Sequence, residues 1–242
     1  ADPNLRPQLR ITYVAGSAAP TATATATPTR TATPTATTAA SVPPTTTRTP
    51  TPTTPASGTA ELVISQGQDT YISQWYPTTA FGSNTLLGIR PPDVSAALIQ
   101  FNLAALPPNA QIISASLNLW AYRQSNIHSL TAGLYQVLKP WDAATATWNN
   151  ASSTLPWHAP GCNGSSDRGS LPFSEQTVNA ANQWFAFDVT PLVQAWASGL
   201  SPNLGVVLKA SGSVSVQYDF ASFEWADPNL RPQLRITYVA GS

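Results

Sequence analysis

The clearest pattern of apolar and polar positions in the chain is ISASLNLWAY, from Ile113 to Tyr122. Strict alternation predicts a β-strand, because successive side chains of a strand point to opposite faces. One face would carry Ala115, Leu117, Leu119 and Ala121, and the other Ser116, Asn118, Trp120 and Tyr122. If the aliphatic face is core, Trp120 and Tyr122 point away from it.

Shorter runs of the same character follow, separated by the turn-forming residues Pro, Gly, Asn and Ser. We expect strands at 61–65, 70–73, 86–90, 97–103, 134–138, 184–189, 204–209, 214–220 and 234–239. A helix is indicated at 190–198, with Thr190 as N-cap, Pro191 at the first helical position and Gly199 just past the end. It would cover one end of the sandwich with Leu192, Val193 and Trp196. Many short strands with one helix predict an all-β, jelly-roll-like β-sandwich.

An extended Thr/Pro-rich linker, residues 18–58, precedes the predicted sandwich. Seventeen of its 41 residues are threonine, eight are proline, and its charges are Arg30 and Arg48. Such a composition cannot build a core, and proline favours extended polyproline II. Tracts of this kind are typical of O-glycosylated stalks, with a bare flexible spacer as the alternative. The expected O-glycosylation sites are Thr21, Thr23, Thr25, Thr27, Thr29, Thr31, Thr33, Thr35, Thr45, Thr46, Thr47, Thr49, Thr51 and Thr53.

The segment ADPNLRPQLRITYVAGS occurs twice without change, at 1–17 and at 226–242. The offset of 225 residues (226 − 1) indicates one period of a tandem repeat and the beginning of a second, as in a window of a longer polymer of domains. Each copy predicts a half-buried strand entered through a proline. The first copy would complete the preceding domain, insert into a neighbouring chain, or remain without a partner. The inter-repeat strand residues are Leu9, Ile11 and Tyr13, and then Leu234, Ile236 and Tyr238.

The predicted organisation is therefore a last strand of the preceding repeat (1–17), the linker (18–58) and the sandwich (59–242). The chain has 11 basic and 11 acidic residues, which argues against nucleic-acid binding. No apolar run is long enough to span a membrane. The single cysteine, Cys162, permits no disulfide within the chain and is expected to be a partly buried or loop thiol.

An ordered set of motifs in the sandwich region resembles DNRLRE-type domains. The opening motifs are DTYI at 69–72, FG at 81–82, LIQFNL at 98–103 and LPPNAQIISASLNL at 106–119. The central ones are Trp141, TWN at 147–149, Trp157 and PG at 160–161. The closing ones are FDVTPLVQAWASG at 187–199, PNLGVVL at 202–208 and RPQLRITY at 231–238. The resemblance implies a jelly-roll β-sandwich of a secreted prokaryotic protein, in a family with some members counted among carbohydrate-binding modules. It also implies that the duplicated segment is the closing strand of the domain.

Trp120 and Tyr122 are the main candidate binding residues. Two aromatic side chains on one exposed strand face suit sugar stacking or a contact between domains, although loops or the linker could instead cover them as ordinary packing. Trp141, Trp148 and Trp157 fall in a long irregular loop. A sugar site is an alternative there, but we expect them to pin the loop to the sandwich edge with a small core of its own.

No catalytic or metal-binding set is apparent in the sequence. His128 and His158 have no metal-ligand spacing, and no Asp-rich loop is present, so no metal and no cofactor are expected. Asn150 and Asn163 fit the N-glycosylation pattern.

The leading hypothesis is a structural repeat unit of an extracellular prokaryotic filament or surface stalk. Its beads would join copies of the chain head to tail through Thr/Pro linkers, with attached glycans. The second hypothesis is a carbohydrate-binding module of a secreted adhesin or multidomain enzyme, with a polysaccharide as partner. An enzyme is least favoured, because fold alone carries no function and no site is visible.

Overall fold

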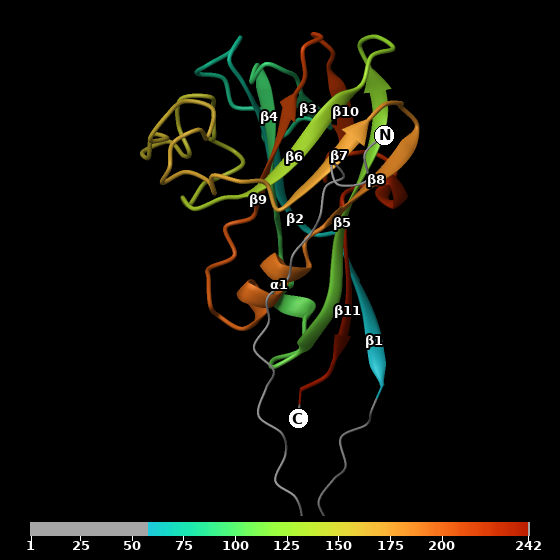
Figure 1. Cartoon of the computed structure of the whole chain (residues 1–242). Coiled ribbons are helices and arrows are strands. Elements are labelled where there is room, and N and C mark those ends of the chain that lie inside the picture. Colours follow the sequence, from blue (N-terminus) through green and yellow to red (C-terminus); the bar gives the residue numbers. More distant parts are fainter. Residues whose placement is uncertain (1–57, 242) are drawn as a thin grey trace, which may run out of the picture. The chain divides into compact units, whose positions relative to one another are not determined.

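The computed structural model describes residues 58–241, which form a β-sandwich of two antiparallel sheets with one short α-helix (Figure 1). The predicted fold class is therefore confirmed for this part of the chain. Residues 1–57 lie outside the described residues. With them lie the first copy of the inter-repeat strand (Leu9, Ile11, Tyr13), the linker and all the predicted O-glycosylation sites.

The first sheet, sheet A, is organised around the long strand β5 (Gln111–Gln124). Both β8 and β11 pair with residues 116–118 of β5, so they must lie on its opposite edges. Strand β10 continues the β11 edge along residues 121–124 of β5. The other strands of sheet A are β1 (Thr59–Ile64), β3 (Leu86–Ile89), β8 (Gln183–Asp188), β10 (Tyr218–Ala221) and β11 (Gln233–Val239).

The second sheet, sheet B, has the strand order β2-β4-β9-β6-β7. Its central strands are rich in buried aliphatic residues, because one face packs on sheet A and the other is covered by a long loop. Its strands are β2 (Gly67–Ser73), β4 (Ser95–Phe101), β6 (Leu130–Gln136), β7 (Ser174–Val178) and β9 (Val206–Ser211).

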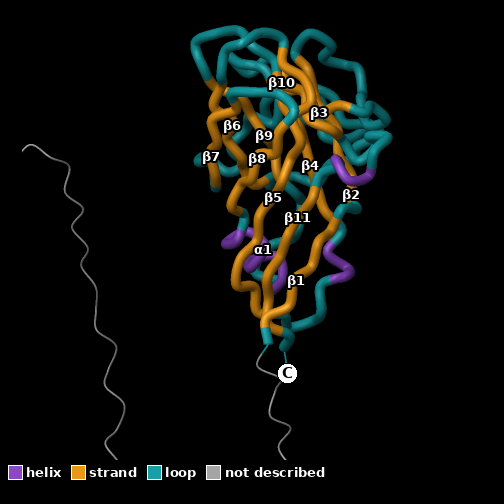
Figure 2. Tube along the Cα trace, turned by 90° about the vertical axis from the view of Figure 1, so that its right-hand side faces the viewer, coloured by secondary structure: helices purple, strands orange, loops and turns teal. Residues whose placement is uncertain are grey.

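The main core lies between the two sheets. On β5, Ala115, Leu117, Leu119 and Ala121 are all buried in it, as the alternation predicted. The duplicated segment contributes to the same core through β11, which lies between β1 and β5 (Figure 2). Leu234 and Ile236 are 1% exposed, and Tyr238 packs against the core. This copy is thus an integral strand of the sandwich.

The helix α1 spans Thr190–Ala197 and covers the core with Leu192 and Val193, while Trp196 packs at its margin. Gly199 adopts φ +73°, as expected after a helix end. The predicted N-cap is wrong, because Thr190 is the first residue of the helix and Val189 occupies the N-cap position without a side-chain cap. The backbone N–H of Thr190 donates to the Asp188 carboxylate at 2.9 Å. The Thr190 hydroxyl instead accepts a hydrogen bond from the backbone of Ala115 at 2.8 Å, which ties the helix to β5.

The strands predicted from the sequence do not include β7, because its sequence SEQTV is polar and lacks the usual strand composition. Pairing with β6 along five residues makes it a strand. Strand β10 also begins at Tyr218 and not at Val214, since residues 212–217 form an irregular loop with a bend at 213–214.

Candidate functional site

Two tryptophans face each other on the outer side of sheet A. Trp120 of β5 pairs in register with Trp184 of β8, and their rings meet edge to face with centroids 5.6 Å apart. Trp184 alternates with the buried Phe185 and Phe187, so it must point away from the core. Its side chain is 38% exposed, which leaves part of the indole accessible to a ligand.

A second aromatic pair extends this surface along β5. Tyr122 packs against Trp225 with ring centroids 4.3 Å apart. Trp225 comes from the loop between β10 and β11, which Arg231 holds by donating from Nε to the Trp225 carbonyl at 2.8 Å. We call Trp120, Tyr122, Trp184 and Trp225 the aromatic surface. The predicted pair Trp120 and Tyr122 therefore lies on the outer face, half-buried against two further aromatic residues.

An ion pair borders the aromatic surface. A β-bulge between Asp219 and Phe220 changes the register of β10 on β5, and Arg123 contacts the Asp219 carboxylate at 2.6 Å. Asp219 is 2% exposed, whereas the Arg123 side chain remains largely accessible. Burial raises the pKa of the Tyr122 phenol, and the charge of Asp219 raises it further. Tyr122 therefore keeps its proton and can donate a hydrogen bond.

A groove of about 600 Å³, lined by both polar and apolar residues, lies on sheet A below the aromatic surface. Four adjacent strands, β1, β11, β5 and β8, supply most of its lining. The polar residues in it include Glu61, Ser114, Ser116, Asp188, Arg235 and Thr237. Hydrogen bonds from Thr190 lower the pKa of Asp188, so this carboxylate is ionised at neutral pH. The groove can therefore offer hydroxyl, carboxylate and guanidinium groups as hydrogen-bond partners.

A third aromatic group lies between β2 and β3. Tyr71 stacks on Phe81 with centroids 4.3 Å apart, and Tyr76 meets Phe81 edge to face. In the same loop Trp75 is 57% exposed, with the guanidinium of Arg90 over its ring at 4.8 Å. This group is the alternative aromatic site of the described chain.

The three tryptophans of the long loop form a second core. Trp141, Trp148 and Trp157 are buried against the outer face of sheet B, on Ile72 and Leu98 among others. This loop projects to the left of the sheets in Figure 1. The expected role in anchoring the loop is confirmed, although the contact is with a sheet face and not only its edge. All three indoles are buried, and those of Trp141 and Trp157 donate to the carbonyls of Leu204 and Thr147, so the three rings are not available for sugar stacking.

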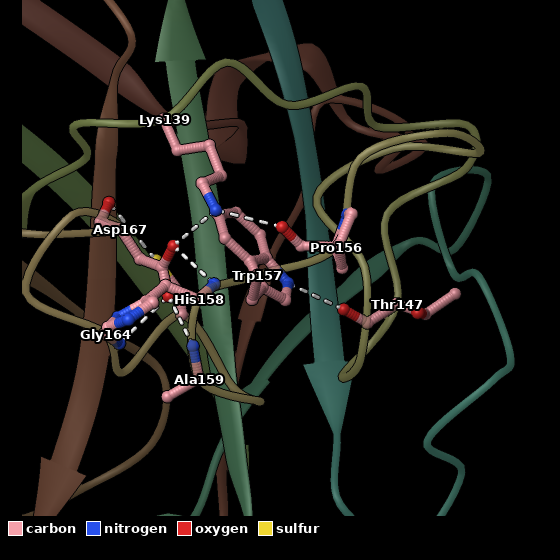
Figure 3. A network of polar contacts seen from close by, with 9 residues as sticks. Lys139, Thr147, Pro156, Trp157, His158, Ala159, Gly164 and Asp167 are labelled. Carbon is pink, nitrogen blue, oxygen red and sulfur yellow. Dashed lines mark hydrogen bonds and ion pairs between the residues drawn. The ribbon is translucent and has the colours of Figure 1, made fainter.

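Asp167 holds the end of this loop together (Figure 3). Its carboxylate accepts hydrogen bonds from the backbone N–H groups of His158, Ala159 and Gly164 and pairs with Lys139 at 3.0 Å. Burial alone would raise the pKa of Asp167, but these donors together keep it below its usual value. The network is therefore a structural clamp.

The remaining candidates of the loop have similar local roles. Burial raises the pKa of Cys162 to about 12, so it is a fully buried, unreactive thiol. The Asn163 amide donates to Asp93 at 2.6 Å and to the Pro160 carbonyl, whereas Asn150 forms an isolated bridge with Pro156. Whether either asparagine carries a glycan stays a prediction.

One buried carboxylate has a strongly perturbed pKa. Burial raises the pKa of Asp69 to about 8, although the backbone N–H of Phe223 lowers it, and the nearby charge of Glu224 raises it further. Asp69 is only 1% exposed, so it cannot reach a substrate. Within residues 58–241, no group of three or more His, Cys, Asp or Glu side chains is placed to hold a metal ion. In the same region no helix is long and apolar enough to cross a membrane.

Sequence reasoning missed Trp184, Trp225 and the groove. Trp184 could have been found, because alternation with Phe185 and Phe187 places it on the outer face. Trp225 had no local signal, since the loop that carries it reaches Tyr122 only through the tertiary fold. The groove needs four strands that are distant in sequence.

Comparison with known proteins identifies the family. The family model described as carbohydrate-binding module family 96 matches residues 60–238, from β1 to β11. Among curated proteins, none matches the chain. The expected carbohydrate-binding-module character is thus confirmed at the level of the family. Because the match spans well over half of the chain, the chain belongs to carbohydrate-binding module family 96.

Proposed function

We propose that this domain binds a polysaccharide through the aromatic surface and performs no catalysis on it. The observation that carries the proposal is the pair Trp120 and Trp184, two indoles side by side on the outer face of sheet A. The family match supports a carbohydrate as the ligand. A module of this kind acts outside the cell, where it brings an attached protein to a polysaccharide.

The chemistry of the surface fits a sugar ring. One face of a pyranose presents C–H groups, which an indole or phenol ring can remove from water, while the hydroxyl groups point to the sides. The Tyr122 phenol keeps its proton, and the Arg123 guanidinium lies over the Tyr122 ring at 6.0 Å from its centre, so both groups can donate to those hydroxyl groups. Apolar stacking would thus supply affinity, and these donors would supply orientation.

The decisive experiment replaces Trp184 with alanine. The full chain and the Trp184→Ala variant are run by affinity electrophoresis in gels containing a panel of soluble polysaccharides, and hits are titrated calorimetrically. We expect a loss of affinity of about tenfold or more, because a central aromatic contact is worth about 1.4 kcal/mol or more. Leu171→Ala is the matched control, since Leu171 is exposed and belongs neither to the aromatic surface nor to the lining of the groove.

The same assay separates the two aromatic sites. If Trp75→Ala abolishes retention while Trp184→Ala does not, the ligand binds at the β2–β3 loop and the proposed surface is wrong. Retention by no polysaccharide of the panel would argue against the function itself. Circular dichroism of each variant shows whether it is folded.

A second candidate function is the repeat unit of a filament. It rests on the duplication, since the segment 226–242 contains an integral core strand and residues 1–17 repeat its sequence. If the first copy inserts into a neighbouring chain, the full chain should form concentration-dependent polymers in sedimentation velocity, and Ile11→Asp should abolish them. A monomer at every concentration would exclude strand donation between chains. Polymer formation would place the glycan-binding surface on a repeating fibre.

A further inference from the structure

The closing strand β11 occupies one well-defined position in sheet A, between β1 and β5 (Figure 2). It pairs with both neighbours along its length, and its Leu234 and Ile236 are buried in the main core. We call this position the closing-strand site, formed by residues 59–64 of β1 and 111–118 of β5. The site holds one strand at a time, whereas the chain contains the sequence of that strand twice.

The repeated segment is a complete structural unit of the sandwich. It starts directly after Trp225 and contains the short 3-10 helix Pro228–Leu230 and the whole of β11. It also contains Arg231, which fastens the loop of the aromatic surface through the Trp225 carbonyl. Residues 1–17 reproduce every one of these side chains, at numbers lower by 225. Residues 59–225 therefore need one copy, and either copy, to complete the sandwich.

The chain can deliver the first copy to the closing-strand site from its other end. Val239 of β11 is the register partner of Thr59, the first residue of β1. The end of a strand in this site thus lies about 5 Å from the beginning of β1. In the first copy the corresponding Val14 is joined to Thr59 through residues 15–58, which have only this gap to close. The result is a circular permutation of the sandwich, which folded domains tolerate where chain ends lie close together.

Loop lengths set the balance between the two copies. Strand β11 is joined to β10 through the 11 residues 222–232, whereas the first copy is joined to β1 through the 44 residues 15–58. Loop closure becomes less probable with about the 3/2 power of length, so the fourfold longer connection disfavours the first copy by roughly eightfold. The identical side chains pack identically in the site, so about one chain in ten would hold the first copy at equilibrium.

We propose that residues 1–17 compete with residues 226–242 of the same chain for the closing-strand site, so that either end of the chain can complete the sandwich. This inference goes beyond polysaccharide binding and does not depend on it. It also differs from strand donation between chains, because the exchange takes place within one molecule. A chain whose second copy is damaged would keep a closed sheet A and, with it, the support of the aromatic surface.

Aspartate substitutions in the full chain test the exchange. Ile236 is 1% exposed, so with one usable copy Ile236→Asp should raise the unfolding equilibrium constant about a thousandfold or more. With the exchange, the first copy takes over and the rise should be limited to roughly tenfold, which is the cost of the longer loop. Ile11→Asp alone should change the constant by less than about twofold, and the double variant should show the full loss. Urea unfolding measures all three.

The matched control for the double variant is Ile236→Asp combined with Ala36→Asp. It adds the same second charge to the linker and leaves both copies otherwise unchanged. We expect it to be as stable as Ile236→Asp alone, because Ala36 has no counterpart in the closing strand.

A disulfide shows directly which copy fills the site. Arg235 is the register partner of Ser116, and Arg10 is its counterpart in the first copy. Opposite residues of paired strands have Cα atoms within disulfide reach, so Arg10→Cys with Ser116→Cys should cross-link when the first copy is in place. The chain is refolded from urea at low concentration and then oxidised. The native Cys162 is buried and does not compete, and Arg10→Cys with Thr177→Cys, on the outer strand of sheet B, is the negative control.

In the Ile236→Asp background we expect nearly every chain to form the 10–116 disulfide as a monomer, seen on a non-reducing gel and by mass spectrometry of tryptic peptides. Absence of this disulfide, or unfolding of Ile236→Asp to the same extent as the double variant, would overturn the inference. A disulfide-linked dimer would also overturn it and would place the first copy in a neighbouring chain. None of these outcomes changes the test of polysaccharide binding by Trp184→Ala.

Discussion

The carboxylate Oδ2 of Asp69 accepts a hydrogen bond from the backbone N–H of Phe223 at 2.9 Å, although the two residues are 154 positions apart. The bond joins β2, in sheet B, to the loop that follows β10 in sheet A. The same loop carries Trp225 of the aromatic surface two residues later. One buried carboxyl group thus helps to position part of the proposed binding site.

The first prediction concerns pH and Asp69→Asn. The pKa of Asp69 is raised from 3.8 to about 8, so the folded state holds a proton that the unfolded chain releases between these values. The contribution of protonated Asp69 to the free energy of unfolding is fully present below pH 4. It is lost as the pH rises towards 8, and the free energy of unfolding falls by up to about 1.4 kcal/mol per pH unit in this range. Asparagine is always neutral and should remove this slope. Urea unfolding at several pH values measures it, and an equal slope in both proteins would contradict the assignment.

Trp148→Ala should destabilise the domain by about 3–5 kcal/mol, because it empties a large volume in the second core. Trp148 is 5% exposed and packs in the cluster on sheet B. The free energy of unfolding from urea titration measures the loss. Leu171→Ala, at a position of the same loop that is 76% exposed, should change it by less than about 0.5 kcal/mol. Similar effects of the two changes would mean that the loop has no core of its own.

Gly161→Ala is expected to be disruptive for two reasons. Gly161 has φ +83°, which a residue with a side chain adopts only at a cost, and an added Cβ would lie 2.6 Å from Cζ2 of Trp148. We expect a loss of about 1–3 kcal/mol in the free energy of unfolding. Gly199→Ala has the strained φ but open space around it, so it measures the first effect alone. An equal loss in both variants would show that Trp148 moves aside freely.

Arg123→Ala should lower the free energy of unfolding by about 1–3 kcal/mol, mainly because it leaves the buried Asp219 carboxylate without its ion partner. The gain from the pair itself is small, since the Arg123 side chain is 59% exposed and screened by water. The double variant with Asp219→Asn should therefore regain part of the stability. Chemical unfolding of the three variants completes a double-mutant cycle. A zero coupling energy would show that the pair contributes nothing.

Local sequence pattern predicted much of the sandwich. The alternation at 113–122 correctly placed Leu117 and Leu119 in the core and Trp120 on the outer face, because a strand with one buried face imposes period two. The same reasoning failed at β7, whose polar sequence becomes a strand only by pairing with β6. It also misassigned the helix cap, since the Thr190 hydroxyl bonds to Ala115, 75 residues away.

The candidate site was only half visible in the sequence. Trp120 and Tyr122 could be singled out from their spacing on one strand. Their partners Trp184 and Trp225 could not be assigned, because the pairing of β8 with β5 and the path of the β10–β11 loop are set by the whole fold.

The sequence by itself determined the all-β class, the outward direction of Trp120 and Tyr122, and the exact repetition of the closing strand, because each is a local or literal property of the chain. The tertiary structure alone decided that four aromatic residues form one surface, that a groove of mixed lining lies on the same sheet, and that the tryptophans of the long loop are core. These features depend on which strands become neighbours, and strand neighbours are chosen by burial across the whole sandwich.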